Sequence, residues 1–146
     1  MTQQERQVAK LLNRIGVPPH LKGYEFIKTA VLMVLDDGSL IHAITKELYP
    51  DVAKKHTTTA SKTERAIRNA VETSFDNMPP EMIEELFGNC ISFNKGKPAN
   101  SQFIATLVEA IKMREDYESE GNTNEKKNDD YAIKFVDSRS NHNGIF

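Results

Sequence analysis

The stretch from Thr57 to Met78 constrains the fold most, because it combines a helix start, a buried stripe and a charged face. It opens with hydroxyl side chains that can accept hydrogen bonds from the free N–H groups of a helix start, and Ser61 and Glu64 have capping-box spacing. Small or apolar residues then recur at three- and four-residue steps, as in an amphipathic helix. The expected buried stripe comprises Ala60, Ile67, Ala70 or Val71, Ser74 or Phe75, and Met78. We therefore expect a helix that starts near Thr59.

The opposite face of this helix is polar and basic. Its residues are Ser61, Lys62, Arg65, Arg68, Asn69 and Glu72. Between residues 54 and 69 there are five basic residues and one acidic residue, a local charge of plus four in a chain whose formal net charge is −2. Either a solvated helix surface or a binding surface for a polyanion has this composition.

The preceding segment, Ser39 to His56, favours a binding surface. It predicts a helix with Ile41, Ile44, Thr45, Leu48 and Val52 on one face, and it ends in two lysines and a histidine. A helix, a short Thr-rich turn and a basic helix form the plan of a helix-turn-helix, whose second helix enters the major groove of DNA. Lysine and arginine can pair with guanine, and glutamate can accept from cytosine N4. Lys62, Glu64 and Arg65 are therefore candidate base contacts.

The rest of the chain predicts further helices around one core. Helical periodicity covers residues 2–15, residues from about 20 to 35 after two prolines, residues 81–87, and the segment after Asn100, which we expect to cap the last helix. A chain of 146 residues with 38% hydrophobic content has room for one domain and can fill its core. The sequence predicts a compact all-α domain of about six helices over residues 1–114.

Residues 115–146 predict an acidic, disordered tail. They contain eight acidic and four basic residues and few apolar ones. Residues 131–136 alternate like a strand, which fits either a docking segment or an apolar patch in an unstructured tail.

Several classes of protein are disfavoured by the composition. The four histidines lie far apart and the chain has one cysteine, so we expect no metal site, no cofactor and no internal disulfide. Convergent acid, base and nucleophile residues are also missing, which argues against an enzyme. The sequence lacks the run of about 20 apolar residues that a membrane helix needs and the apolar core of a signal peptide. We expect a cytoplasmic protein that does not enter membranes.

Four stretches resemble a known family: IGVPPHLKGYEFIKTAV, ITKELYPDVAKKHTTTASKTERAIRNAVE, ELFG and KGKPANSQFIATLVEAI. From residue 8 to residue 114 the chain is similar to the C-terminal DNA-binding effector domain of the stage-zero sporulation response regulator. The resemblance implies a six-helix domain that binds duplex DNA at a TGTCGAA-like element, often in tandem copies, and regulates transcription of sporulation genes.

The resemblance also implies roles for individual residues. Lys62, Glu64 and Arg65 match the base-reading positions. The positions near phosphates, or supporting the base readers, match Thr57, Thr58, Thr59, Ser61, Arg68 and Asn69. The usual motif SRVERAIRHA reads SKTERAIRNA here, and a lysine at position 62 lacks the planar fork with which arginine pairs with guanine.

Partners follow from the resemblance as well. Phe87 and Ile91 match the region that contacts the sigma subunit of RNA polymerase, and tandem DNA sites imply self-association. The family's effector domain follows a receiver domain, which these 146 residues do not contain, so the chain is either a fragment or, as the unusual tail favours, a stand-alone effector domain. The alternative function is an interaction module that modulates RNA polymerase or the full-length regulator without binding DNA.

Overall fold

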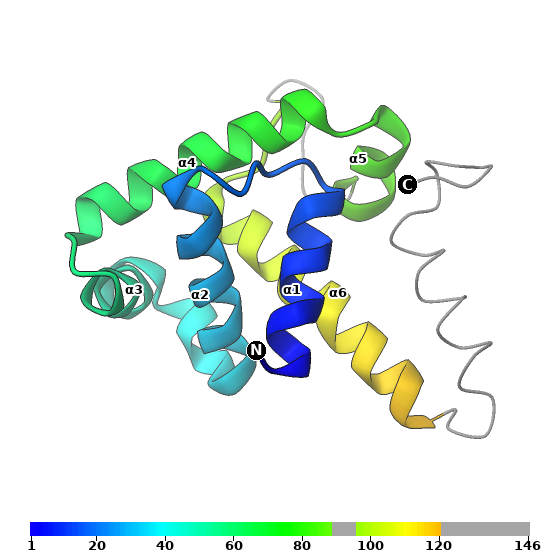
Figure 1. The fold of residues 1–146 in the computed structure, drawn as a ribbon, viewed down its shortest axis with the longest axis horizontal. Helices are drawn as coiled ribbons and strands as arrows, with labels where there is room; N and C mark the ends of the chain where they lie inside the picture. The colour runs from blue at the N-terminus through cyan, green and yellow to red at the C-terminus, as the bar shows by residue number, and fades with distance from the viewer. Residues whose placement is uncertain (89–95, 121–146) are drawn as a thin grey trace.

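The described part of the chain is built from helices alone (Figure 1). The computed structural model describes residues 1–88 and 96–120, and of residues 118–120 only the backbone. Within these ranges it contains six α-helices and no strand. The helices are α1 (Gln3–Arg14), α2 (Lys22–Asp36), α3 (Tyr49–Lys55), α4 (Ala60–Asn77), α5 (Pro80–Phe87) and α6 (Asn100–Glu120). The predicted compact all-α fold is confirmed.

Helix α2 lies at the centre of the core. Its sequence is apolar on most sides, and it contacts α1, α4 and α6. Phe26, Ile27, Ala30 and Val31 are all buried among these neighbours. Burial on several sides is the expected environment of a helix with no wide polar face.

The C-terminal half of α4 is fastened to the end of α1. The Ser74 hydroxyl donates to the carbonyl oxygen of Ile15 at 2.6 Å, and Asn77 Nδ2 donates to the carbonyl oxygen of Gly16 at 3.0 Å. Gly16 has a φ of +83°, a conformation that glycine adopts without a steric penalty at the end of a helix. The N-terminal half of α4 extends away from this anchor, towards α3 (Figure 1).

Three phenylalanines join α4, α5 and α6. The rings of Phe87 and Phe103 stack with centroids 5.3 Å apart, and Phe75 meets Phe87 edge-on at 5.0 Å. Phe87 and Phe103 are completely buried. Aromatic pairs at such separations stabilise a core beyond the area that they bury.

The predicted continuous helix from Ser39 to His56 is wrong. The segment instead forms a 3₁₀ turn, η1 (Gly38–His42), a π turn, η2 (Ile44–Leu48), and then α3. Ala43 separates the two turns with φ −138° and ψ 47°, outside the helical region. The cap of the first turn is Asp37, whose carboxylate accepts from the Ser39 N–H at 3.1 Å. Of the predicted apolar face only Leu48 and Val52 are fully buried, whereas Thr45 is exposed.

Candidate DNA-binding surface

The turn between α3 and α4 has a defined geometry. The Thr58 N–H donates to the Ala53 carbonyl at 2.9 Å and the Thr57 N–H to the Lys54 carbonyl at 3.4 Å. This pair of bonds is a Schellman motif, in which the residue after the helix cap takes a left-handed conformation that glycine usually supplies. Here Thr57 takes it, with a φ of 55°. The turn therefore fixes the direction in which α4 leaves α3, and the two helices form a helix-turn-helix.

A contact from α2 supports this turn from the core side. The Thr29 hydroxyl lies 2.8 Å from Nε2 of His56, and the Phe26 and His56 rings are 5.0 Å apart. His56 is the residue that caps α3. Its ring thus connects the start of the turn to the central helix.

The start of α4 is fixed by two threonines. The Thr59 hydroxyl accepts from the Lys62 N–H at 3.1 Å, and the Thr63 hydroxyl donates to the Thr59 carbonyl at 2.9 Å. Thr63 is completely buried. The predicted buried stripe of the helix did not include it, because threonine is polar. The capping box predicted for Ser61 and Glu64 is wrong, because the cap is Thr59 and the Glu64 carboxylate pairs with Arg68.

The basic face of α4 is exposed to solvent. All six residues predicted for this face are exposed: Ser61, Lys62, Arg65, Arg68, Asn69 and Glu72. Lys62, Arg65 and Asn69 follow one another at three- and four-residue steps, so they lie on one side of the helix. Glu64 lies on the neighbouring flank, and its side chain is 35% exposed. The structure thus brings two of the three candidate base contacts together and places the third beside them.

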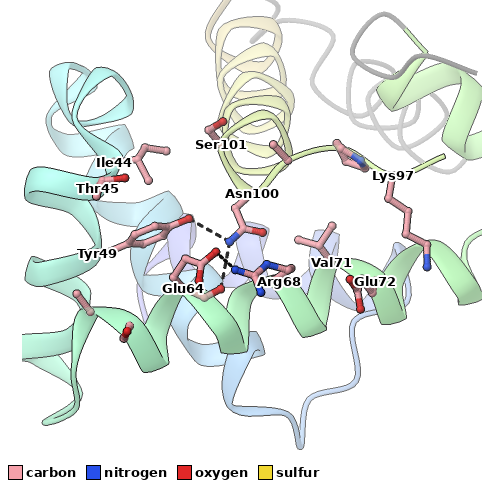
Figure 2. Close-up of a pocket in the computed structure, with 14 residues that line it drawn as sticks. Ile44, Thr45, Tyr49, Glu64, Arg68, Val71, Glu72, Lys97, Asn100 and Ser101 are labelled. Carbon is pink, nitrogen blue, oxygen red and sulfur yellow. Dashed lines mark hydrogen bonds and ion pairs between the residues drawn. The ribbon is translucent and has the colours of Figure 1, made fainter. Parts of the chain in front are cut away.

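An open groove of about 860 Å³ runs along the flank of α4 that carries Glu64 and Arg68 (Figure 2). Its other walls are the start of the η2 turn with the first residue of α3, and the segment that leads into α6 with the first residues of that helix. Lys97, in that segment, forms an ion pair with Asp76 of α4 at 3.2 Å. The groove therefore lies between the start of α6 and one flank of α4.

A buried amide links the walls of this groove. Asn100 Nδ2 donates to the Tyr49 hydroxyl oxygen at 3.0 Å and to the Glu64 carbonyl oxygen at 3.2 Å (Figure 2). The expectation that Asn100 caps the last helix is wrong, because α6 begins at Asn100 itself and the amide bridges to α3 and α4. The pKa of the Tyr49 hydroxyl is raised, mainly because the group is buried. The hydrogen bond with Asn100 and the charge of Arg68 lower this pKa, and the Glu64 carboxylate raises it, but burial has the largest effect.

Phe87 does not offer its side chain to a partner, because the side chain is completely buried against Phe75 and Phe103. The sequence-based role of Phe87 as a polymerase contact is therefore not supported by its position. Ile91 lies outside the described residues, as does the strand-like segment 131–136.

The expected start of the disordered tail also needs correction. Helix α6 continues to Glu120, so residues 115–120 are helical. Gln4 Nε2 donates to the Glu115 carboxylate at 2.9 Å, which connects this end of α6 to α1. The remainder of the predicted tail lies outside the described residues.

The described residues form neither a membrane span nor a metal-binding cluster. In residues 1–88 and 96–120, no helix is both long enough and apolar enough to cross a membrane. Over the same ranges, no three residues of the types that bind metals form a group that could hold an ion.

The chain matches a known protein family. A family model described as "Sporulation initiation factor Spo0A C terminal" matches residues 8–111. The matched range includes α2, the helix-turn-helix, α5 and the part of α6 that borders the groove.

Proposed function

This chain belongs to the family of the sporulation initiation factor Spo0A C-terminal domain, and on that basis we propose that its α4 reads a TGTCGAA-like element in duplex DNA. The family is one of DNA-binding transcription regulators and not of enzymes, so the chain is a DNA-binding domain of the sporulation-initiation type.

One observation carries the proposal: the exposed pair Lys62 and Arg65 in the N-terminal half of α4. A recognition helix contacts base edges mainly through this part of its length. Both side chains can donate to guanine O6 and N7, and Arg65 can do so with two parallel bonds. Because the Schellman turn and the Thr59 cap fix the start of α4, both residues are held on a rigid support.

The turn and the flanks of α4 would contact the DNA backbone. Hydroxyl, amide and free backbone N–H groups at a helix start bind phosphate oxygens well. The residues that we propose for these contacts are Thr57, Thr58, Thr59, Ser61 and Asn69. Lys54 and Lys55 are exposed at the end of α3, where they would add attraction that weakens with salt.

The family resemblance supports two further partners in addition to DNA. One is the sigma subunit of RNA polymerase, and the other is a second copy of the chain on tandem elements. A sigma contact near α5 would use residues other than Phe87, whose side chain is enclosed in the core.

The test of the proposal is the Arg65→Ala variant of the full chain. We expect it to bind the element less tightly by about 1–3 kcal/mol and to lose preference at one base position, because a base-pairing fork is removed. Fluorescence anisotropy with duplexes that vary each position of the element would measure both effects. Arg6→Ala, which removes an exposed arginine from α1, is the matched control and should leave binding nearly unchanged.

Unchanged affinity of Arg65→Ala for the element would contradict the proposed base contact. The Lys62→Arg variant tests the proposed base contact of Lys62 by a gain in base preference. It should sharpen the preference for guanine at one position, because a planar fork replaces a point charge.

A further inference from the structure

Arg68 is already engaged within the protein. Its Nη2 atom donates to Oε2 of Glu64, one helical turn earlier on the same flank of α4. Both side chains are partly exposed, Arg68 by 51% and Glu64 by 35%. The ion pair therefore lies at the edge of the proposed DNA interface rather than in the core.

A carboxylate at this place has an electrostatic problem. The phosphates of DNA produce a negative potential, so an unpaired glutamate beside the duplex is repelled. A paired guanidinium offsets this charge. It also takes up Oε2 and leaves Oε1 of Glu64 to accept from a base, for which cytosine N4 is the matching donor.

The backbone of Glu64 also has a partner in the protein, on α6. Asn100 Nδ2 donates to the Glu64 carbonyl oxygen at 3.2 Å and also to the Tyr49 hydroxyl (Figure 2). Asn100 is 9% exposed; its bond to Tyr49 is buried and its bond to Glu64 is partly buried. Glu64 is thus fixed at both ends, by Arg68 at the carboxylate and by Asn100 at the carbonyl.

We infer that Arg68 is a positioning residue, which holds the Glu64 carboxylate ready to accept from cytosine, rather than a phosphate contact. This inference rests on the proposed function, because it presupposes that α4 reads bases. It revises the role near phosphates that the resemblance implied for Arg68. Arg68 would contribute to specificity through Glu64 without contacting a base.

A double-mutant cycle on the full chain tests the inference. The probes are duplexes with the TGTCGAA-like element in which each position is varied in turn, and Glu64→Ala identifies the position that Glu64 reads. We expect Arg68→Ala to lower the cytosine preference at that position by roughly tenfold and to leave the other positions unchanged. Arg68→Lys should restore part of this preference, since an ammonium can still pair with the carboxylate.

The cycle separates the two roles of Arg68. In the Glu64→Ala background, adding Arg68→Ala should change affinity by less than about twofold, because the carboxylate that it positions is gone. The dependence of affinity on salt should also stay the same. Arg6→Ala again serves as the control for loss of one arginine.

Two outcomes would overturn the inference. If Arg68→Ala weakens every duplex alike and reduces the salt slope by about one contact in both backgrounds, Arg68 binds a phosphate. If the cytosine preference survives in Arg68→Ala, the pair does not position Glu64. Under either outcome, the unmutated chain still prefers the element over a scrambled duplex. If the unmutated chain itself lacked that preference, the proposed function would be overturned as well.

Discussion

Thr57 adopts a conformation that its side chain disfavours. Its φ of 55° lies in the left-handed region, where a β-branched residue is a genuine outlier. We expect Thr57→Gly to raise the free energy of unfolding by about 0.5–1 kcal/mol, because relief of the steric penalty exceeds the extra entropy that glycine loses on folding. Urea unfolding of the full chain measures the change.

Thr58→Gly is the matched control for this prediction. In the described residues Thr57 is the one non-glycine residue with a positive φ, so glycine at Thr58 relieves no strain and should destabilise the fold. Equal effects of the two substitutions would show that the left-handed conformation of Thr57 carries no cost.

The buried hydroxyl of Tyr49 should make stability fall at alkaline pH. Because its pKa is raised in the folded state, the native protein holds this proton more tightly than the unfolded chain, whose tyrosines titrate near pH 10. The contribution is present in full below about pH 10 and is lost as the pH rises further. We expect Tyr49→Phe to flatten this decline, as measured by urea unfolding from about pH 8 to about pH 11.

Some of the slope should remain in Tyr49→Phe. Burial also raises the pKa of Tyr24, and the negative charge of Glu25 raises it further. Tyr24 therefore also lowers the stability of the fold at alkaline pH. The variant also removes the acceptor for Asn100, so its stability at neutral pH falls and only the slopes are comparable. Identical slopes in the two proteins would contradict the role assigned to Tyr49.

At the scale of residues, the sequence predicted exposure better than it predicted partners. Periodicity correctly placed Lys62 and Arg65 outside and Ile67 inside, because a helix repeats every 3.6 residues. It could not reveal that Asn100 bonds to Glu64, 36 residues away, since such a contact depends on tertiary packing. It also missed Thr63, whose hydroxyl is satisfied locally by the Thr59 carbonyl and can therefore be buried.

At the scale of elements, Gly23 sets how closely α2 can approach α4. A Cβ atom added at Gly23 would lie 2.3 Å from the carbonyl oxygen of Ala66 and 2.7 Å from Cβ of Ala70. The helices would have to separate, so we expect Gly23→Ala to cost about 1–3 kcal/mol of unfolding free energy by thermal or urea unfolding.

Gly38→Ala is the control for the helix contact. A Cβ atom there meets nothing within 4 Å, so the substitution should be neutral or slightly stabilising. If Gly23→Ala were equally harmless, the close packing of α2 on α4 would not matter for stability.

The segment from Ser39 to Lys55 shows where element prediction failed. Its apolar residues have approximately helical spacing, and this periodicity gave no sign of the break at Ala43. Tertiary packing buries Leu40 on one side of the break and Leu48 on the other. The spacing of apolar residues therefore did not predict that this segment divides into a 3₁₀ turn, a π turn and an α-helix.

At the scale of the molecule, the fold divides α4 into two halves. Its C-terminal half is fastened by Ser74 and Asn77 to the end of α1, and Phe75 enters the aromatic cluster with α5 and α6. Its N-terminal half carries the exposed Lys62 and Arg65 (Figure 1). The C-terminal half is thus anchored to α1, α5 and α6, whereas the N-terminal half is buried on one side only and presents its basic residues on the other.

We propose that the exposed face of α4 recognises a particular DNA sequence. The most direct measurement is fluorescence anisotropy of the full chain with a duplex that carries the TGTCGAA-like element and with a scrambled duplex, at two salt concentrations. We expect at least roughly tenfold tighter binding to the element, and a preference that persists at the higher salt while both affinities fall. Equal, weak binding to both duplexes would contradict the claim and favour an interaction module that acts on other proteins.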